Sequence, residues 1–490
     1  MLRQLKHHLL SFRQWLDISP GLWLVFGLSF AVWSYLIFFS EMSIVFDAIG
    51  YERLGKMLHE NGWLEFFKTG PHREPLYPWL ISFSMYWADM FRCPYQMVLK
   101  FLQVGLLFST QFLLLVVLRQ LKIHKVIVSL IILYVALSPA LLGATFSLFS
   151  EIVTLPFVLL SLICMVQSWR VLLYGPMRLV VVMALLTAGA ALLVVFAKGV
   201  FMGVFGAYLI MVFVTSCVLS VREKKGYWLR ASVYLIVSLI CMLSFVMGYM
   251  FLYKKYSGAF QFTDRYTSAV FGTAYKRSQK VTPRIFWAHV ASIPGKGVCR
   301  RFFSEEECVY CEAYSADYFA GIFLSKELAG VPIEKQDAKV LQMTKELIKM
   351  NLGQYLIFMV YEAARMPFWE STQAGFVIYP SGLERFFSWG LFKDGLRLFV
   401  SCLTILSLIS MICRTPRYYC ALLGVKGEQH EQQICFFVVF IVLVYTSFFT
   451  FTFVLTRYAF PIVPLYLVMI ACYLNRLLNS KRPEGQSSTG

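Results

Sequence analysis

The chain has 490 residues, of which 59% are hydrophobic, 17% aromatic and only 15% charged, and its formal net charge is +18. A soluble domain carries about 25% charged residues, so this composition excludes an ordinary soluble enzyme. The Lys and Arg residues do not form a single patch, but lie mostly between apolar runs and in one long polar stretch. That distribution is typical of loops that orient a membrane protein, and it disfavours nucleic-acid binding.

Long runs without charge predict transmembrane helices, because roughly 20 apolar residues cross the hydrocarbon core and lipid-exposed backbone must be helical. The first run follows a basic stretch and is too long for the core of a cleaved signal peptide, so we expect an uncleaved first span. About ten spans are expected, near residues 20–40, 98–118, 126–142, 152–168, 179–197, 200–220, 231–253, 396–413, 434–455 and 458–475. The predicted fold is an all-α polytopic membrane protein.

Basic residues indicate which loops lie in the cytoplasm. Arg3, Lys6 and Arg13 place the N-terminus there, and basic residues recur in alternate loops and after residue 475. The alternation requires residues 75–91 and 352–368 to lie along the outer face as juxtamembrane helices. The chain then divides into a transmembrane module (1–253, with an external segment near 41–97), an external loop region (254–395), and C-terminal helices with a cytoplasmic tail (396–490).

Five ionisable residues lie at the outer ends of spans, where they do not serve to orient the chain: Asp47, Glu74, Glu151, Lys198 and Arg457. The spans are otherwise almost free of charge, whereas ion-coupled transporters usually carry ionisable groups at mid-membrane depth. Because the predicted topology puts all five on one face, we expect them to form one site.

Two of the carboxylates each allow a chemical and a structural interpretation. Asp47 is a candidate general base or, alternatively, a helix cap, and Tyr51 lies one turn further along the same face. Glu74 is a candidate acceptor-binding or metal-binding group with His72 as co-ligand, or a solvated partner of Arg73.

The two cations, Lys198 and Arg457, suggest an anionic ligand. Lys198 and Arg457 lie where anchoring cations are not expected, and a guanidinium fork suits phosphate. Together they could hold a lipid phosphate whose apolar tail enters the bilayer. Glu151 opens the fourth span, where the helix dipole alone would favour a carboxylate.

Cys299, Cys308 and Cys311 share the external region. Three sulfurs without a second pair make a poor metal site, and outside the cytoplasm a disulfide is favoured. The spacing allows Cys299 to pair with either of the other two, or with neither.

The ordered set of residues resembles the GT-C superfamily of membrane glycosyltransferases, most of all its aminoarabinose transferase and protein O-mannosyltransferase branch. The likeness covers most of the first 260 residues and 457–464. It comprises Asp47 and Tyr51 after the first span, Glu74-Pro75 before an interfacial helix, Glu151 opening the fourth span, Lys198-Gly199 ending the fifth, and Arg457-Tyr458 with Pro461 and Pro464. The chain departs from the family in lacking an Asp-x-Asp pair after the first span, and residues 254–395 have no counterpart.

The resemblance implies sugar transfer from a polyprenyl-phosphate-linked donor to a glycolipid, glycan or protein acceptor outside the cytoplasm. Asp47 would be the base, Glu74 an acceptor or metal contact, and Glu151 would lie on the acceptor or sugar side. Lys198 and Arg457 would contact the donor phosphate, with Tyr51, Arg73 and Tyr458 in support. A divalent metal stays open as a cofactor.

Two further classes remain as alternatives: a transporter or flippase for a lipid-linked glycan, and a structural or channel subunit. The chain contains no Asn-x-Ser/Thr sequon and ends without a retention signal. Both features favour a bacterial inner membrane, with the site facing the periplasm.

Overall fold

The computed structural model describes residues 20–223, 226–263, 266–279, 281–311, 313–370, 376–424, 430–451 and 456–480. These residues are mainly helical, and they contain one two-stranded antiparallel pairing, between β1 (Glu41–Met42) and β2 (Val377–Ile378). The basic stretches before residue 20 and after residue 480, on which the predicted orientation partly depends, lie outside the described residues.

The predicted spans are present as long apolar helices. In the described residues nine segments are long and apolar enough to cross a membrane: α2 (Pro20–Phe39), α5 (Tyr95–Gln120), α8 (Glu151–Tyr174), α9 (Met177–Ala197), α10 (Phe201–Glu223), α11 (Tyr227–Ser257), α20 (Gly390–Ile412), α22 (His430–Thr450), and η2 (Thr456–Ile462) with α23 (Val463–Ser480). A tenth is the pair α6 (Lys125–Leu137) and α7 (Pro139–Phe146), bent by 46°. The prediction of an all-α polytopic membrane protein is confirmed.

The bend between α6 and α7 follows from local sequence. Ser138 ends α6 and caps α7, its hydroxyl accepting from the Leu141 amide at 3.2 Å. Pro139 then fills the first position of α7, where its missing N–H is not needed but where it cannot continue the preceding helix.

Two apolar helices are too short to span. α4 (Leu76–Phe91) has 16 residues and α18 (Leu352–Ala363) has 12. At 1.5 Å per residue they extend about 24 and 18 Å, against a hydrocarbon core of about 30 Å. Neither helix is by itself long enough to cross the hydrocarbon core.

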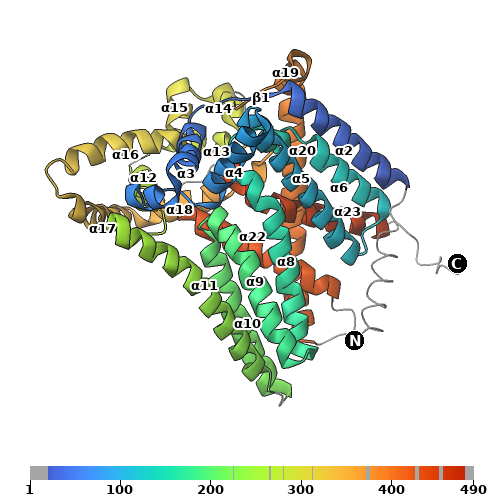
Figure 1. Ribbon diagram of the computed structural model, residues 1–490. Helices are drawn as coiled ribbons and strands as arrows, with labels where there is room; N and C mark the ends of the chain where they lie inside the picture. The colour runs from blue at the N-terminus through green and yellow to red at the C-terminus, as the bar shows by residue number, and fades with distance from the viewer. Residues whose placement is uncertain are drawn as a thin grey trace.

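The remaining helices gather mainly at one end of the bundle, uppermost in Figure 1, where α3 and α4 also lie. They are α3 (Asp47–Thr69), α12 (Tyr266–Ser278), α13 (Pro283–Ser292), α14 (Lys296–Phe302), α15 (Glu305–Tyr310), α16 (Ala313–Glu327), α17 (Ile333–Met350), η1 (Met366–Phe368) and α19 (Ser381–Ser388). A short helix, α21 (Thr415–Leu422), joins α20 to α22. A disulfide links Cys299 of α14 to Cys308 of α15, which decides between the pairings left open by the sequence.

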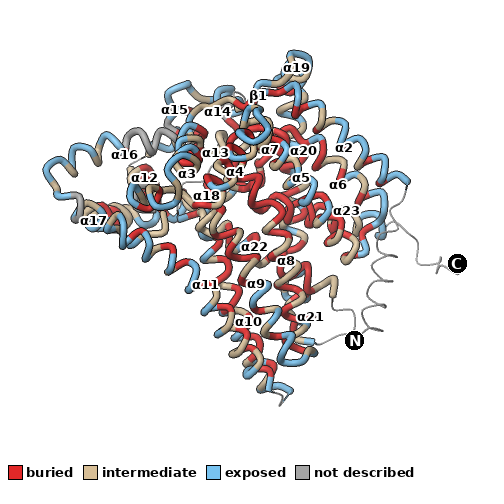
Figure 2. The backbone as a smooth tube through the Cα atoms, in the orientation of Figure 1, coloured by how far each residue is buried: buried red, intermediate tan, exposed pale blue. Residues whose placement is uncertain are grey.

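The core lies where α8 packs against the C-terminal helices. In α8 and in η2–α23, 72% and 78% of the apolar window is buried, compared with 22% in α11. Figure 2 shows buried backbone concentrated around α5, α8, α22 and α23. The C-terminal helices therefore complete the bundle that the N-terminal helices begin, and this arrangement carries η2 next to the start of α8.

The end of the region 254–395 returns to the long apolar helices. Trp369 is fully buried, with its ring 6.0 Å from that of Tyr134 and 6.4 Å from that of Phe460. Beyond it, β2 pairs with β1, so that Ile378 faces Glu41. The segment is thus attached both to η2 and to the strand that precedes α3.

Candidate functional site

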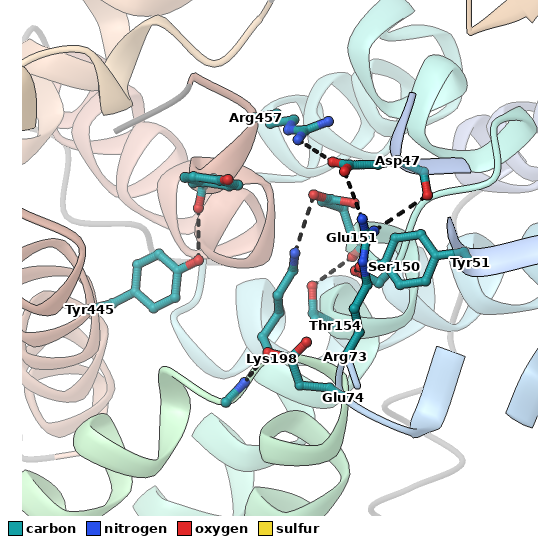
Figure 3. Close-up of polar contacts among 12 residues, drawn as sticks. Asp47, Tyr51, Arg73, Glu74, Ser150, Glu151, Thr154, Lys198, Tyr445 and Arg457 are labelled. Atoms are coloured by element: carbon teal, nitrogen blue, oxygen red, sulfur yellow. Dashed lines mark hydrogen bonds and ion pairs between the residues drawn. The ribbon is translucent and has the colours of Figure 1, made fainter. Parts of the chain in front are cut away.

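Asp47 lies at the centre of the charged residues. It is the first residue of α3, and Phe46, with φ of 51°, occupies the cap position before it. Its Oδ1 accepts from Arg73 Nη2 at 2.8 Å, and its Oδ2 accepts from Arg457 Nη2 (Figure 3). The helix-cap interpretation does not account for this carboxylate, because two guanidinium groups bind it.

Arg73 approaches Asp47 across Tyr51. Its Cζ lies 4.3 Å from the centroid of the Tyr51 ring, and the Tyr51 hydroxyl is 2.9 Å from Ser150 Oγ. A Cβ at Gly50 would lie 3.3 Å from Arg73 Nη2, so glycine leaves room for this approach. The interpretation of Arg73 as a solvated partner of Glu74 is wrong, since its carboxylate partner is Asp47.

The Glu74 carboxylate accepts a hydrogen bond from a backbone amide. Its Oε1 accepts from the amide of Gly199 at 2.9 Å. A Cβ at position 199 would lie 3.4 Å from that oxygen and 3.3 Å from the Phe262 ring, which explains why glycine follows Lys198. The contact joins the segment before α4 to the turn between α9 and α10.

Among the described residues, no third possible metal ligand joins Glu74 and His72. His72 Nε2 lies 3.0 Å from Thr69 Oγ1, and its ring packs against Phe66 with centroids 5.2 Å apart. Among the residues that the structure describes, no group of three or more His, Cys, Asp or Glu side chains is placed to hold a metal ion.

Glu151 and Lys198 form the second ion pair. Glu151 begins α8, as predicted, and Lys198 directly follows α9. Lys198 Nζ lies 3.3 Å from Glu151 Oε1, and the two side chains are 15% and 6% exposed. The other oxygen, Oε2, is buried and has no hydrogen-bond partner in the described part of the chain. Such an atom is costly to bury unless another group binds it.

Tyr458 connects the two ion pairs. Lys198 Nζ lies 5.8 Å and Arg457 Cζ 5.7 Å from the centroid of its ring. Its carbonyl oxygen accepts from the Tyr445 hydroxyl at 2.7 Å, as Figure 3 shows. Two cations far apart in the sequence therefore face one aromatic ring, each of them beside a carboxylate.

A crevice of about 270 Å³ opens beside these pairs. Its lining comprises Ala140, Gly143, Ala144, Phe149, Glu151, Arg457 and Phe460. The α7 residues in this set are small, so the crevice lies between a smooth helix face and the charged network. The network itself contains three carboxylates, of Asp47, Glu74 and Glu151, and three cations, of Arg73, Lys198 and Arg457. An anionic ligand that binds these cations displaces carboxylates, which then need a proton or a ligand hydroxyl as their partner.

Sequence reasoning located all five span-end charges in this network, together with Tyr51, Arg73 and Tyr458. It missed Ser150, Tyr445 and Phe149, which bear on the same groups. Arg457 Cζ lies 5.3 Å from the Phe149 ring. Serine and aromatic residues are frequent in the spans of this chain, so only the neighbouring charged residue Glu151 could have pointed to Phe149 and Ser150.

A comparison of the sequence with protein-family models and with curated proteins finds no match.

Proposed function

We propose that this protein transfers a sugar from a polyprenyl-phosphate donor to an acceptor at the end of the bundle that carries α3. The observation that carries the proposal is the Asp47 carboxylate held between Arg73 and Arg457, with the Glu151–Lys198 pair across the Tyr458 ring. The set provides a proton acceptor next to cations that suit a phosphate.

Donor binding would use Lys198 and Arg457. Both are largely buried, with side chains 15% and 10% exposed, so a phosphate that replaced their carboxylate partners would form strong charge-assisted hydrogen bonds. An apolar crevice of about 300 Å³ lies between α8, α9, α10 and α22, lined by residues that include Val194 and Phe205. Val194 lies one helical turn before Lys198, so the apolar tail of a donor whose phosphate bound Lys198 would run along this side of the bundle.

The reaction would begin when the donor phosphate replaces Asp47 as the partner of Arg457. When the phosphate takes Arg457, the carboxylate keeps Arg73 and gains an oxygen that can accept a proton from an acceptor hydroxyl or amine. The bond between the sugar carbon and the phosphate oxygen breaks as the acceptor bonds to that carbon. The cations stabilise the charge left on the departing polyprenyl phosphate.

The proposal includes a location in a bacterial inner membrane, with this end in the periplasm. Besides the loop charges, the Cys299–Cys308 disulfide supports this location, because disulfides persist in oxidising compartments. The disulfide belongs to α14 and α15, which lie at the same end as α3 in Figure 1.

A binding experiment tests the donor contacts. Purified protein in lipid nanodiscs is titrated with a short-chain polyprenyl phosphate, using wild type, Lys198→Gln, Arg457→Gln and the double variant. We expect each single change to weaken binding about tenfold or more, since hydrogen bonds to charged groups contribute roughly 1.5–3 kcal/mol. The double variant should depart from additivity, because the two cations share one ligand.

Lys254→Gln is the matched control, since Lys254 is also a cation at the end of a span, on α11, but is exposed and lies over Phe260. Equal affinity in all five proteins would contradict the donor site. Release of polyprenyl phosphate from a panel of polyprenyl-phosphate sugars, with membrane glycans as acceptors, then separates a transferase from a flippase, which would bind the lipid but not cleave it.

A further inference from the structure

The end of the external region forms a wall next to the crevice. The Ser43 amide donates to the Phe376 carbonyl at 3.1 Å, extending the pairing of β1 with β2. The Phe376 ring lies 4.7 Å from that of Phe149, which lines the crevice and lies beside Arg457. These contacts hold residues 376–379 near the charged network.

Tyr379 carries a buried hydroxyl close to Gly143. The oxygen has no hydrogen-bond partner in the described part of the chain. It lies 3.9 Å from the position that a Cβ would occupy on Gly143, which lines the crevice. Its ring packs edge-on against Phe387, with centroids 5.2 Å apart. Burial raises the pKa of Tyr379, so the hydroxyl keeps its proton and is available as a donor.

Glu151 supplies a second such atom in the lining of the crevice. Its Oε2 is buried and has no partner among the described residues, and the whole residue is only 5% exposed. Native proteins pair nearly all their buried polar groups. A ligand that bound in the crevice next to Gly143 would complete the hydrogen bonds of both atoms.

The crevice is kept open by a fixed helix. Glu370 Oε1 accepts from the Ala140 amide at 3.1 Å, and its Oε2 accepts from Ser138 Oγ at 2.8 Å. These bonds fix the start of α7, and with it the small residues that line the crevice. The space is therefore bounded by a helix held in place on one side and by the charged pairs on the other.

We infer that this crevice binds the sugar of the donor, with Tyr379 donating a hydrogen bond to a sugar oxygen and Glu151 Oε2 accepting one from a sugar hydroxyl. The inference rests on the proposed function: Arg457 lines the crevice, Glu151 pairs with Lys198, and the group bonded directly to the donor phosphate is its sugar. About 270 Å³ of space lies between the lining residues, and part of it is open to solvent. Tyr379 becomes a determinant of donor specificity supplied by the external region.

The test compares affinity for polyprenyl phosphate with affinity for polyprenyl-phosphate hexoses and pentoses, in wild type and Tyr379→Phe. Wild type should bind at least one sugar-bearing lipid more tightly than the bare phosphate. The variant keeps the ring but removes the hydroxyl, so it should reduce that preference about 3- to 10-fold, the effect of one hydrogen bond. Its affinity for bare polyprenyl phosphate should stay unchanged.

Gly143→Val gives a second approach, because it places a side chain in the crevice. It should abolish the preference for the sugar-bearing lipid and retain binding of the bare phosphate. Tyr361→Phe is the matched control, since the Tyr361 hydroxyl is also buried without a described partner but belongs to α18, away from the crevice. This control should keep the wild-type preference and, like Tyr379→Phe, the wild-type thermal stability.

The outcomes separate the two proposals. A wild type that binds sugar-bearing and bare lipids equally, or a Tyr379→Phe variant that keeps the full preference, would overturn the sugar site and leave the phosphate contacts standing. A wild type that binds no polyprenyl phosphate would overturn the proposed function, and the sugar site with it.

Discussion

The network around Asp47 and the ion pair between Arg277 and Glu362 both bury a carboxylate against guanidinium groups, yet their surroundings differ. Asp47 is 24% exposed, with Arg73 at 13% and Arg457 at 10%. The side chains of Arg277 and Glu362 are 1% and 4% exposed, with Nη2 and Oε2 2.7 Å apart. Water and ligands can reach the first set, but the second is enclosed by protein.

The enclosed pair belongs to a structural junction. Arg277 Nη1 also donates to the carbonyl of Thr450 at the end of α22, at 2.6 Å, so the pair ties α12 and α18 to a membrane span. Arg365 Nη2 donates to Ser292 Oγ at 2.8 Å and to the Cys311 carbonyl at 3.0 Å. Burial alone would raise the pKa of Glu362, but the neighbouring cations, chiefly Arg277 and Lys276, hold it down to about 2.

The comparison teaches that burial of charge does not by itself identify a functional site. Around Arg277 the cations bind backbone oxygens and a carboxylate, and the pair links three helices. Around Asp47 the ion pairs border a crevice, and Glu151 presents an oxygen with no partner among the described residues. A network that adjoins space and is partly exposed can bind a ligand, while an enclosed one stabilises the fold.

Asp47→Asn is the change from which we expect the largest effect. Removal of a general base typically lowers the rate 10²–10⁴-fold, so release of polyprenyl phosphate should fall by that factor. The free energy of unfolding should fall less than in Glu362→Gln, because water can reach the more exposed Asp47. Turnover measured by mass spectrometry and thermal unfolding of the same samples check both parts.

Asp89→Asn is the control for Asp47→Asn, since Asp89 is a carboxylate paired with His59 at 2.9 Å on exposed surface. It should retain wild-type turnover. If Asp47→Asn also retained wild-type turnover, the network around Asp47 would join that of Arg277 as a purely structural one.

Glu362→Gln should mainly lower the free energy of unfolding, whereas Asp47→Asn should mainly lower the rate. Removing one partner of a buried pair leaves the other charge uncompensated and typically costs about 3–5 kcal/mol. Denaturant unfolding in detergent micelles measures the loss. Glu327→Gln, which breaks an exposed pair with Lys339, should cost less than about 1 kcal/mol. Similar losses in the two variants would show that the Arg277 junction is not the enclosed network described above.

Acid should weaken the same junction with a defined sign. The pKa of Glu362 is lowered from 4.5 to about 2 in the folded protein, so the folded state holds its charged form more strongly than the unfolded chain does. The resulting stability is fully present above pH 4.5 and is lost as the pH falls toward 2, in total about 3 kcal/mol. Unfolding measured between pH 5 and 3 should show a steeper loss in wild type than in Glu362→Gln. Parallel curves would contradict the assignment.

Local sequence was sufficient to predict much of this structure. A run such as 179–197 has one solution in lipid, a helix, so composition alone predicts it. Asp47 and Tyr51 share a face because the helix repeat puts residues four apart together. An apolar run predicts one straight span over 126–142, but Ser138-Pro139 divides it into α6 and α7. Hydrophobicity alone does not show where a helix changes direction.

The sequence by itself determined the membrane class, the helical spans and the span-end positions of the five charges, because these depend on hydrophobicity and on charge within a few residues. Only the tertiary structure decided which charges pair. Arg73 could have bound its neighbour Glu74, but the packing of α3 against α4 turns it across Tyr51 to Asp47, and the packing of η2 on α8 brings Arg457 to the same carboxylate. The placement of Tyr379 and Glu370 beside α7 likewise depends on a part of the region 254–395 that returns to the bundle through β2. No local pattern encodes such contacts, since they form between residues that are 26 to 410 positions apart.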